Sequence, residues 1–140
     1  MSLEENKAVV RRFFEGFEAN DEAAMKAVLS SDLVAFTHGG PGPQTREEML
    51  QGIRMWNDTF SDTRFEILEQ IAEGDTVVTY MVFHSTHSKA EFQGLPPTGK
   101  KIEMQGVTIE RINNGKIVER RAISDWLVAM QQLGLIPQAG

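Results

Sequence analysis

The segment from Gly106 to Asp125 constrains the fold more than any other stretch, because it predicts two β-strands joined by a tight turn. Asparagine tolerates turn conformations and glycine adopts positive φ without steric cost, so Asn113-Asn114-Gly115 is interpreted as a three-residue loop. Such a loop is a type I turn closed by a glycine bulge. Facing residues of an antiparallel pair lie on one side of the sheet. We therefore expect one face, the wall of a pocket, to carry Thr108, Glu110, Arg120 and Ala122.

The rest of the chain predicts helices first and a meander of strands afterwards. Expected helices cover residues 3–19, a short segment capped by Asn20-Asp21 and closed by Ser30-Ser31-Asp32, a segment capped by Thr45 and closed by Ser61-Asp62, and residues 126–133. Expected strands cover residues 33–38, 64–73, 76–87, 101–112 and 116–125. This order is typical of an α+β fold, and we expect a single domain over residues 1–140 with a ligand cavity between helices and sheet.

Composition argues against several classes of partner. The net charge of −6 disfavours a nucleic-acid-binding surface, which needs clustered lysine and arginine. Without cysteine the chain has no disulfide framework and no thiol nucleophile. No apolar run approaches the ~20 residues that span a bilayer, and the first residues lack the apolar core of a signal peptide. We expect a cytoplasmic protein without membrane or nucleic-acid partners.

Several segments together resemble a known family. They are ENKAVVRRFFEGF near the start, AEGDTVV, THSKAEFQGLPPTGKKI, IERINNGKIVE, and Gln131-Gln132-Leu133-Gly134. In this order they are similar to the SnoaL-like family of polyketide cyclases and ester cyclases, within the NTF2-like superfamily. The resemblance implies an NTF2-like (cystatin-like) α+β barrel or cone, with N-terminal helices packed on a curved antiparallel sheet. It also implies a homodimer and a cofactor-free intramolecular aldol reaction.

The same resemblance exposes a departure at the catalytic positions. The family's catalytic aspartate falls on Ala122, and its supporting histidine falls on Thr108. Alanine transfers no proton, and a threonine hydroxyl is a poor base near neutral pH. Two hypotheses follow: an enzyme of cyclase or isomerase type with a non-standard acid/base residue, or a non-catalytic module for ligand binding or dimerisation.

His87 and Asp125 are the candidate catalytic residues that remain. His87 shares a strand face with Met81 and Phe83, so it could act as a base inside the cavity; alternatively it satisfies a carbonyl of the following loop. Asp125 could reach a ligand or cap the helix that follows it. No local pattern such as H-x-H links the three histidines, so no metal site is expected. The resemblance implies that no cofactor is used.

The remaining candidates are expected to bind a small, largely apolar ligand. Glu110 and Arg120 form either an arginine fork for an acidic or carbonyl group or a plain cross-strand ion pair. His38 could reach the cavity mouth or pack in its loop, whereas His84 is expected to be exposed or in an interface. The apolar walls are assigned to Phe36, Trp56, Met81, Phe83 and Met104, although aromatic residues at such spacings also form simple cores.

Overall fold

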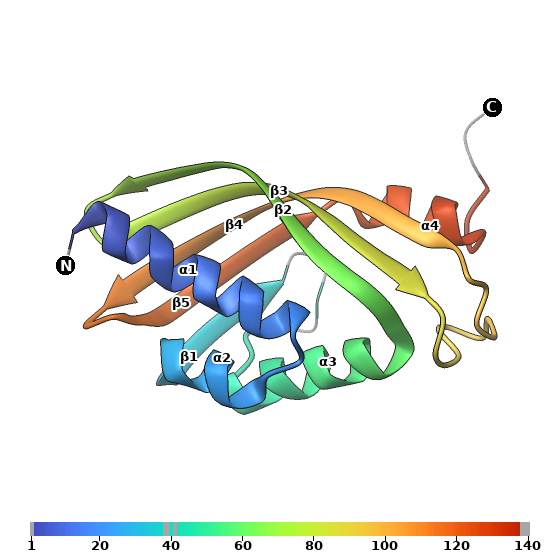
Figure 1. Cartoon of the computed structure of the whole chain (residues 1–140), viewed down its shortest axis with the longest axis horizontal. Helices are drawn as coiled ribbons and strands as arrows, with labels where there is room; N and C mark the ends of the chain where they lie inside the picture. Colours follow the sequence, from blue (N-terminus) through green and yellow to red (C-terminus); the bar gives the residue numbers. More distant parts are fainter. Residues whose placement is uncertain (1, 38–39, 41, 138–140) are drawn as a thin grey trace.

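Five strands form one curved sheet in the order β1-β5-β4-β3-β2, and helices pack against its inner face (Figure 1). This computed structural model describes residues 2–37, 40 and 42–137. The helices are α1 (Leu3–Glu18), α2 (Glu22–Val28), α3 (Arg46–Thr59) and α4 (Trp126–Leu133). The strands are β1 (Leu29–Thr37), β2 (Phe60–Glu73), β3 (Thr76–His87), β4 (Lys101–Asn113) and β5 (Lys116–Ser124). The architecture confirms the predicted NTF2-like α+β fold, with a curved sheet that stays unclosed between β1 and β2.

The two long helices begin where the sequence predicts. Ser2 Oγ accepts a hydrogen bond from the Glu5 amide at 3.0 Å, and Thr45 Oγ1 accepts one from the Glu48 amide at 3.2 Å. Each glutamate returns a bond to the backbone of its cap, which completes a capping box. The apolar stripe of α1 is buried against the sheet through Val9, Val10, Phe13 and Phe14.

Two predicted helix ends are wrong because strands begin earlier than local turn preference suggests. Leu29 is fully buried and pairs with Ile117, so Ser30-Ser31-Asp32 lies within β1 instead of closing α2. The pairing energy of the sheet outweighs the turn preference of serine and aspartate. Ser61-Asp62 likewise lies within β2, where Asp62 has a φ of 53° at a shift of register between Ser61 and Arg64. The positive φ of Asp62 is accommodated there by a β-bulge.

The sheet is not wholly antiparallel, which corrects the expectation from the sequence. β1 runs parallel to β5, with Ala35 beside Arg120 and Thr37 beside Ala122. The other pairs are antiparallel. No hairpin joins β1 to β5, so the local pattern carried no information about their relative direction.

The central hairpin forms as predicted but closes differently. Asn113 pairs with Lys116, so the loop is the two-residue Asn114-Gly115, whose φ values of 53° and 76° are both positive. This is the backbone of a type I′ turn, which matches the twist of the strands. A shift of register then follows between Arg111 and Ile112. Beyond this shift Thr108 pairs with Ala122 and Glu110 with Arg120, so these four residues lie on one face, as predicted.

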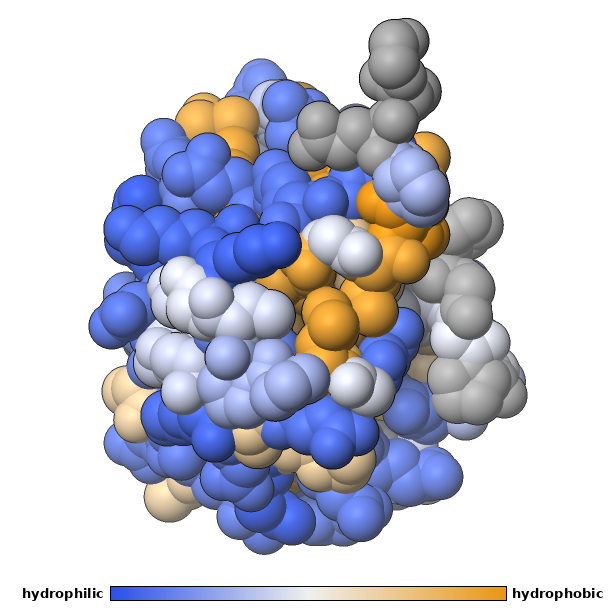
Figure 2. All heavy atoms as spheres, turned by 90° about the vertical axis from the view of Figure 1, so that its right-hand side faces the viewer, coloured by the Kyte–Doolittle hydropathy of each residue, from blue (hydrophilic) through white to orange (hydrophobic). Residues whose placement is uncertain are grey.

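Two apolar clusters fill the space between helices and sheet. One joins α1, α2 and α3 to β1 and β5, and the other joins α4 and Phe60 to the middle of β3 and β4. At the end of the molecule that carries α4 and residues 88–100, apolar side chains reach the surface (Figure 2). Among the described residues, no helix has the length and apolar character needed to cross a membrane.

Candidate functional site

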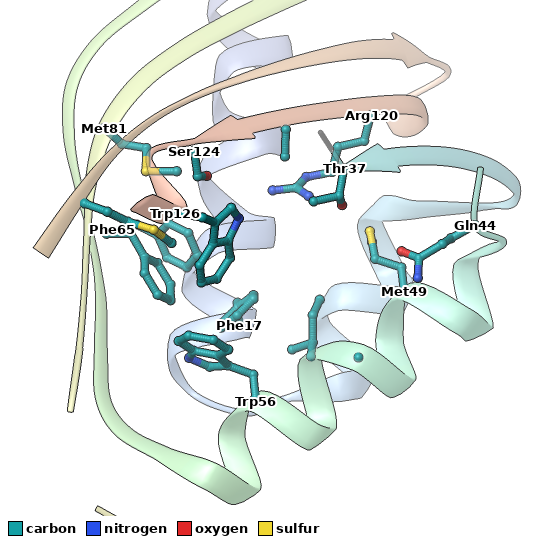
Figure 3. Close-up of a pocket in the computed structure, with 15 residues that line it drawn as sticks. Phe17, Thr37, Gln44, Met49, Trp56, Phe65, Met81, Arg120, Ser124 and Trp126 are labelled. Atoms are coloured by element: carbon teal, nitrogen blue, oxygen red, sulfur yellow. The ribbon is translucent and has the colours of Figure 1, made fainter. Parts of the chain in front are cut away.

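A cavity of about 230 Å³ lies between α3 and the inner face of the sheet (Figure 3). Its two ends differ in character. Phe65 and Met81 lie toward one end with Trp56, whereas Gln44 and Arg120 lie toward the other. The lining residues are Phe17, Thr37, Gln44, Met49, Gly52, Ile53, Trp56, Phe65, Met81, Phe83, Met104, Arg120, Ala122, Ser124 and Trp126.

The aromatic end is built around Trp56 of α3. Its indole stacks on Phe60 at 3.9 Å between ring centroids and with 3° between ring planes. Its Nε1 donates a hydrogen bond to Ser85 Oγ at 3.3 Å. Phe83 and Trp126 meet it edge to face at 5.4 Å and 5.7 Å. Aromatic rings in such contacts offer flat, apolar surfaces, so this end suits a hydrocarbon or aromatic group.

Gly106 makes room for one wall of the cavity. A Cβ atom at this position of β4 would lie 2.9 Å from Met81 Cε and 3.0 Å from Ser124 Oγ. Both neighbours line the cavity. A larger residue at 106 would therefore push Met81 or Ser124 into the space that a ligand would use.

The polar end is built around Arg120 of β5. Its Nε donates to Glu110 Oε2 at 3.1 Å, and its Cζ lies 5.0 Å from the centroid of the Phe13 ring. Thr108 Oγ1 donates to the other oxygen of Glu110 at 2.9 Å. None of the residues that the structure describes accepts a hydrogen bond from the Nη atoms of Arg120. Arg120 is thus held in place through Nε and the face of its guanidinium, which leaves Nη groups for a ligand.

Glu110 is fully buried, and this burial shifts its ionisation. Burial raises the pKa of the Glu110 carboxyl because a charge is poorly solvated there; the positive charge of Arg120 and the hydrogen bonds from Thr108 and Arg120 oppose this rise. Among the described residues that line the cavity, Arg120 is the only charged side chain. The cavity therefore presents a positive charge at one end of an apolar space.

The candidate ligand-binding residues divide into three groups. Six of them line the cavity: Trp56, Met81, Phe83, Met104, Arg120 and Ala122. Thr108 and Glu110 lie on the same sheet face but are completely buried behind Arg120, where they orient it. Phe36 points to the outer face of the sheet, because Ala35 takes the buried position; there it packs under Arg121 at 4.2 Å. His38 lies outside the described residues.

His87 is buried beyond the aromatic end and does not line the cavity. Its Nε2 donates to the Ala90 carbonyl at 2.7 Å, so in the neutral ring Nδ1 accepts from the Thr98 hydroxyl at 3.1 Å. The ring packs against Phe60. Both nitrogen atoms are thus used to hold the 88–100 segment, which is the loop role considered for His87 and leaves no lone pair for a substrate.

Asp125 caps α4 and is absent from the cavity lining. Its Oδ1 accepts a hydrogen bond from the Val128 amide at 3.3 Å, the geometry of an N-cap. His84 lies on the outer face between Glu66 and Glu103, at 2.9 Å and 3.5 Å. Over residues 2–37, 40 and 42–137, no group of three or more His, Asp or Glu side chains is arranged to hold a metal ion.

Sequence reasoning missed part of the aromatic wall. Phe17, Phe65 and Trp126 line the cavity but were not among the residues predicted to form its walls. The spacing of Met49, Ile53 and Trp56 along α3 did contain a signal, since residues three and four apart lie on one helix face. Trp126 had no such signal, because its place depends on how α4 docks on β4.

Comparison with known proteins gives a consistent picture. The sequence model of the SnoaL-like polyketide cyclases matches residues 7–133. The chain is 29% identical to IdmH from Streptomyces antibioticus, provisionally assigned as a polyketide cyclase, over 92% of this chain and 98% of IdmH, with a TM-score of 0.84. It is 24% identical to AclR from Streptomyces galilaeus, provisionally assigned as a hydroxylase, over 99% of this chain and 87% of AclR, with a TM-score of 0.88. The second likeness supports the fold alone. No curated protein matches.

Proposed function

Because the chain belongs to the SnoaL-like polyketide cyclase family, we propose that it binds a small, largely apolar organic molecule in the cavity beneath α3. The ligand carries a carboxylate or an enolate-like oxygen, and Arg120 binds this oxygen. The observation that carries the proposal is the guanidinium of Arg120, fixed by Glu110 at 3.1 Å and exposed to an otherwise uncharged lining of described residues.

The energetics favour an anionic or strongly polarised partner for Arg120. A guanidinium that is largely removed from water loses solvation, and only 13% of the Arg120 side chain is exposed. Glu110 offsets part of this loss through Nε, and the aromatic face of Phe13 offsets more. A ligand oxygen at the Nη atoms would satisfy the remaining donors in the fork geometry that arginine prefers.

The positions that correspond to the family's acid/base pair support binding over proton transfer. Ala122 lines the cavity and pairs across the sheet with Thr108, so the two positions are neighbours on the inner face. Neither side chain transfers a proton readily, and the Thr108 hydroxyl is committed to Glu110.

A second candidate function is stabilisation of an enolate during ring closure, with Arg120 as the electrophilic group. The family match and the 29% identity to IdmH favour it. Here the protein would stabilise negative charge on oxygen, and water or the ligand itself would accept the proton. A ligand recovered chemically changed after incubation would favour this second function over simple binding.

The binding proposal is tested by titrating the protein with 4-methylbenzoate, followed by isothermal calorimetry. Arg120→Ala is expected to weaken binding roughly 10- to 100-fold, the range for hydrogen bonds to charged groups. Arg121→Ala is the matched control, since Arg121 packs over Phe36 on the other sheet face. Equal effects of the two substitutions, or no binding by the wild type, would contradict the proposal.

We also propose that the outer face of the sheet joins two copies of the chain. Ile123, Val107 and Tyr80 are direct neighbours across β5, β4 and β3. Ile123 is 52% exposed in the single chain. Covering such an apolar row supplies the driving force for a symmetric dimer. Light scattering is expected to give a dimer mass for the wild type and a monomer mass for Ile123→Lys, whereas a wild-type monomer would refute the proposal.

A further inference from the structure

A second cavity of about 480 Å³ lies beside the first, at the apolar end of the molecule seen in Figure 2. Its lining comes from α3, α4, the 88–100 segment and the residues after α4. It consists of Trp56, Phe92, Gln93, Trp126, Met130, Leu135 and Ile136. Trp56 and Trp126 line both cavities, so the two spaces are separated by this one pair of indole rings.

The indole rings of Trp56 and Trp126 are held in place by different contacts. Trp56 is fixed by its stack on Phe60 and its hydrogen bond to Ser85. Trp126 is the first residue of α4 and is half-buried. The helix itself is anchored to β4, because Gln132 exchanges two hydrogen bonds with the backbone of Glu103 at 2.8 Å and 3.1 Å. A change of side-chain rotamer at Trp126 would therefore open a passage between the two cavities without moving α4.

The volumes leave room for one ligand that uses both spaces. Pockets that hold small organic ligands usually measure about 300–1,000 Å³. The first cavity, at about 230 Å³, is below this range, whereas the second, at about 480 Å³, and the two together lie within it. Apart from Gln93, which is exposed, the lining of the second cavity is apolar. It suits an alkyl or aryl extension and offers no partner for a charge.

We infer that the second cavity binds the apolar tail of an elongated ligand whose oxygen-bearing head is held by Arg120, with the tail passing between Trp56 and Trp126. The inference rests on the proposed function and adds a substrate class to it: an amphipathic aryl or alkyl acid, or the corresponding keto compound. The head group fixes position and the tail selects for length. The indoles of Trp56 and Trp126, which line both cavities, are the structural reason for this occupant.

The test uses a homologous series of 4-alkylbenzoates with methyl, butyl and octyl tails. Each buried methylene is worth up to about fourfold in affinity, so the wild type is expected to bind the octyl compound at least tenfold more tightly than the methyl compound. Met130→Lys places a charge in the second cavity and is expected to reduce this octyl-to-methyl ratio about tenfold or more. Met55→Lys is the matched control, since Met55 is 64% exposed on α3 and lines neither cavity; its ratio should equal that of the wild type.

Three outcomes would overturn the inference. The ratio could stay near one in the wild type, or Met130→Lys and Met55→Lys could change it equally. In the third outcome the octyl-to-methyl ratio stays near one, and Met130→Lys lowers the mass of the assembly measured by light scattering. This result would mean that another copy of the chain, and not a ligand tail, occupies the second cavity. Failure of the proposed function looks different, because 4-methylbenzoate would then not bind or would bind independently of Arg120. Circular dichroism of each variant separates these results from misfolding.

Discussion

Arg120 and Arg121 are consecutive residues of β5 whose guanidinium groups lie on opposite faces of the sheet. Arg120 reaches inward to Glu110 at 3.1 Å, whereas Arg121 packs outward over the Phe36 ring at 4.2 Å. The alternation of a β-strand imposes this separation. Arg120 therefore faces the cavity and Arg121 faces the outer surface. Substituting each in turn compares the two faces of the sheet at neighbouring positions.

The buried Glu110 predicts a pH-dependent stability. Because burial raises its pKa above the ordinary value of 4.5, the folded state holds the proton more tightly than the unfolded state. The contribution of Glu110 to stability is thus fully present below about pH 4.5 and is lost as the pH rises through the raised pKa. The glutamine of Glu110→Gln carries no charge at any pH, so its contribution to stability stays constant across this pH range. Urea denaturation across this window should show the free energy of unfolding of Glu110→Gln rising relative to wild type. A constant difference would show that Arg120 keeps Glu110 ionised as in water.

Ala122→Asp places a carboxylate at the position where the resemblance puts the family's aspartate, and it tests the charge of the cavity. Ala122 lies on the same face of β5 as Arg120, two residues along the strand. At an effective dielectric constant near 20, repulsion between the new carboxylate and an anionic ligand is expected to weaken 4-methylbenzoate binding roughly 10- to 100-fold at neutral pH. Ala122→Asn adds similar volume without charge and serves as the control in calorimetry. Equal losses for both variants would mean that volume, and not charge, limits binding.

His87 is predicted to stabilise the fold without taking part in binding. His87→Ala removes two hydrogen bonds from a buried ring and leaves the Ala90 carbonyl and the Thr98 hydroxyl without their partner. A loss of about 2–4 kcal/mol in the free energy of unfolding is expected. His84→Ala on the outer face should cost less than about 1 kcal/mol. Folded His87→Ala is expected to bind 4-methylbenzoate as the wild type does. A loss of binding without a loss of stability would show that His87 contributes to the binding site.

Asp125 is predicted to act only as a helix cap. Asp125→Ala should lower the free energy of unfolding by about 1 kcal/mol, the usual value of an N-cap. Asp125→Asn keeps an oxygen acceptor for the Val128 amide and should remain close to the wild type in thermal denaturation. A catalytic role would instead appear as a large loss of any turnover in Asp125→Asn with little change in stability.

The sequence predicted those parts of the fold that local chemistry determines. Capping boxes at Ser2 and Thr45, the strand over residues 76–87, and the set of hairpin residues that share the inner face were all correct. The loop type was wrong, although a two-residue turn followed by a bulge places the same residues on the inner face as the three-residue loop that was expected. The direction of β1 was missed because its partner, β5, lies more than 80 residues away in the chain.

The candidate site was predicted less completely, for reasons of packing. Strand alternation placed Arg120 and Glu110 on the inner face together, which the structure shows. It also placed His87 on that face, but alternation does not say how far along the strand a cavity extends. Phe36 was assigned to the wall because it is aromatic, whereas Ala35 occupies the inward position. Trp126 entered the site only through the docking of α4, which no local pattern encodes.

The most direct measurement is a crystal structure of the protein with 4-butylbenzoate bound. The account predicts the carboxylate at hydrogen-bonding distance, about 2.7–2.9 Å, from the Nη atoms of Arg120. It also predicts the butyl group directed toward Trp56 and Trp126. A carboxylate bound away from Arg120, or a ligand seated on the outer face of the sheet, would contradict it.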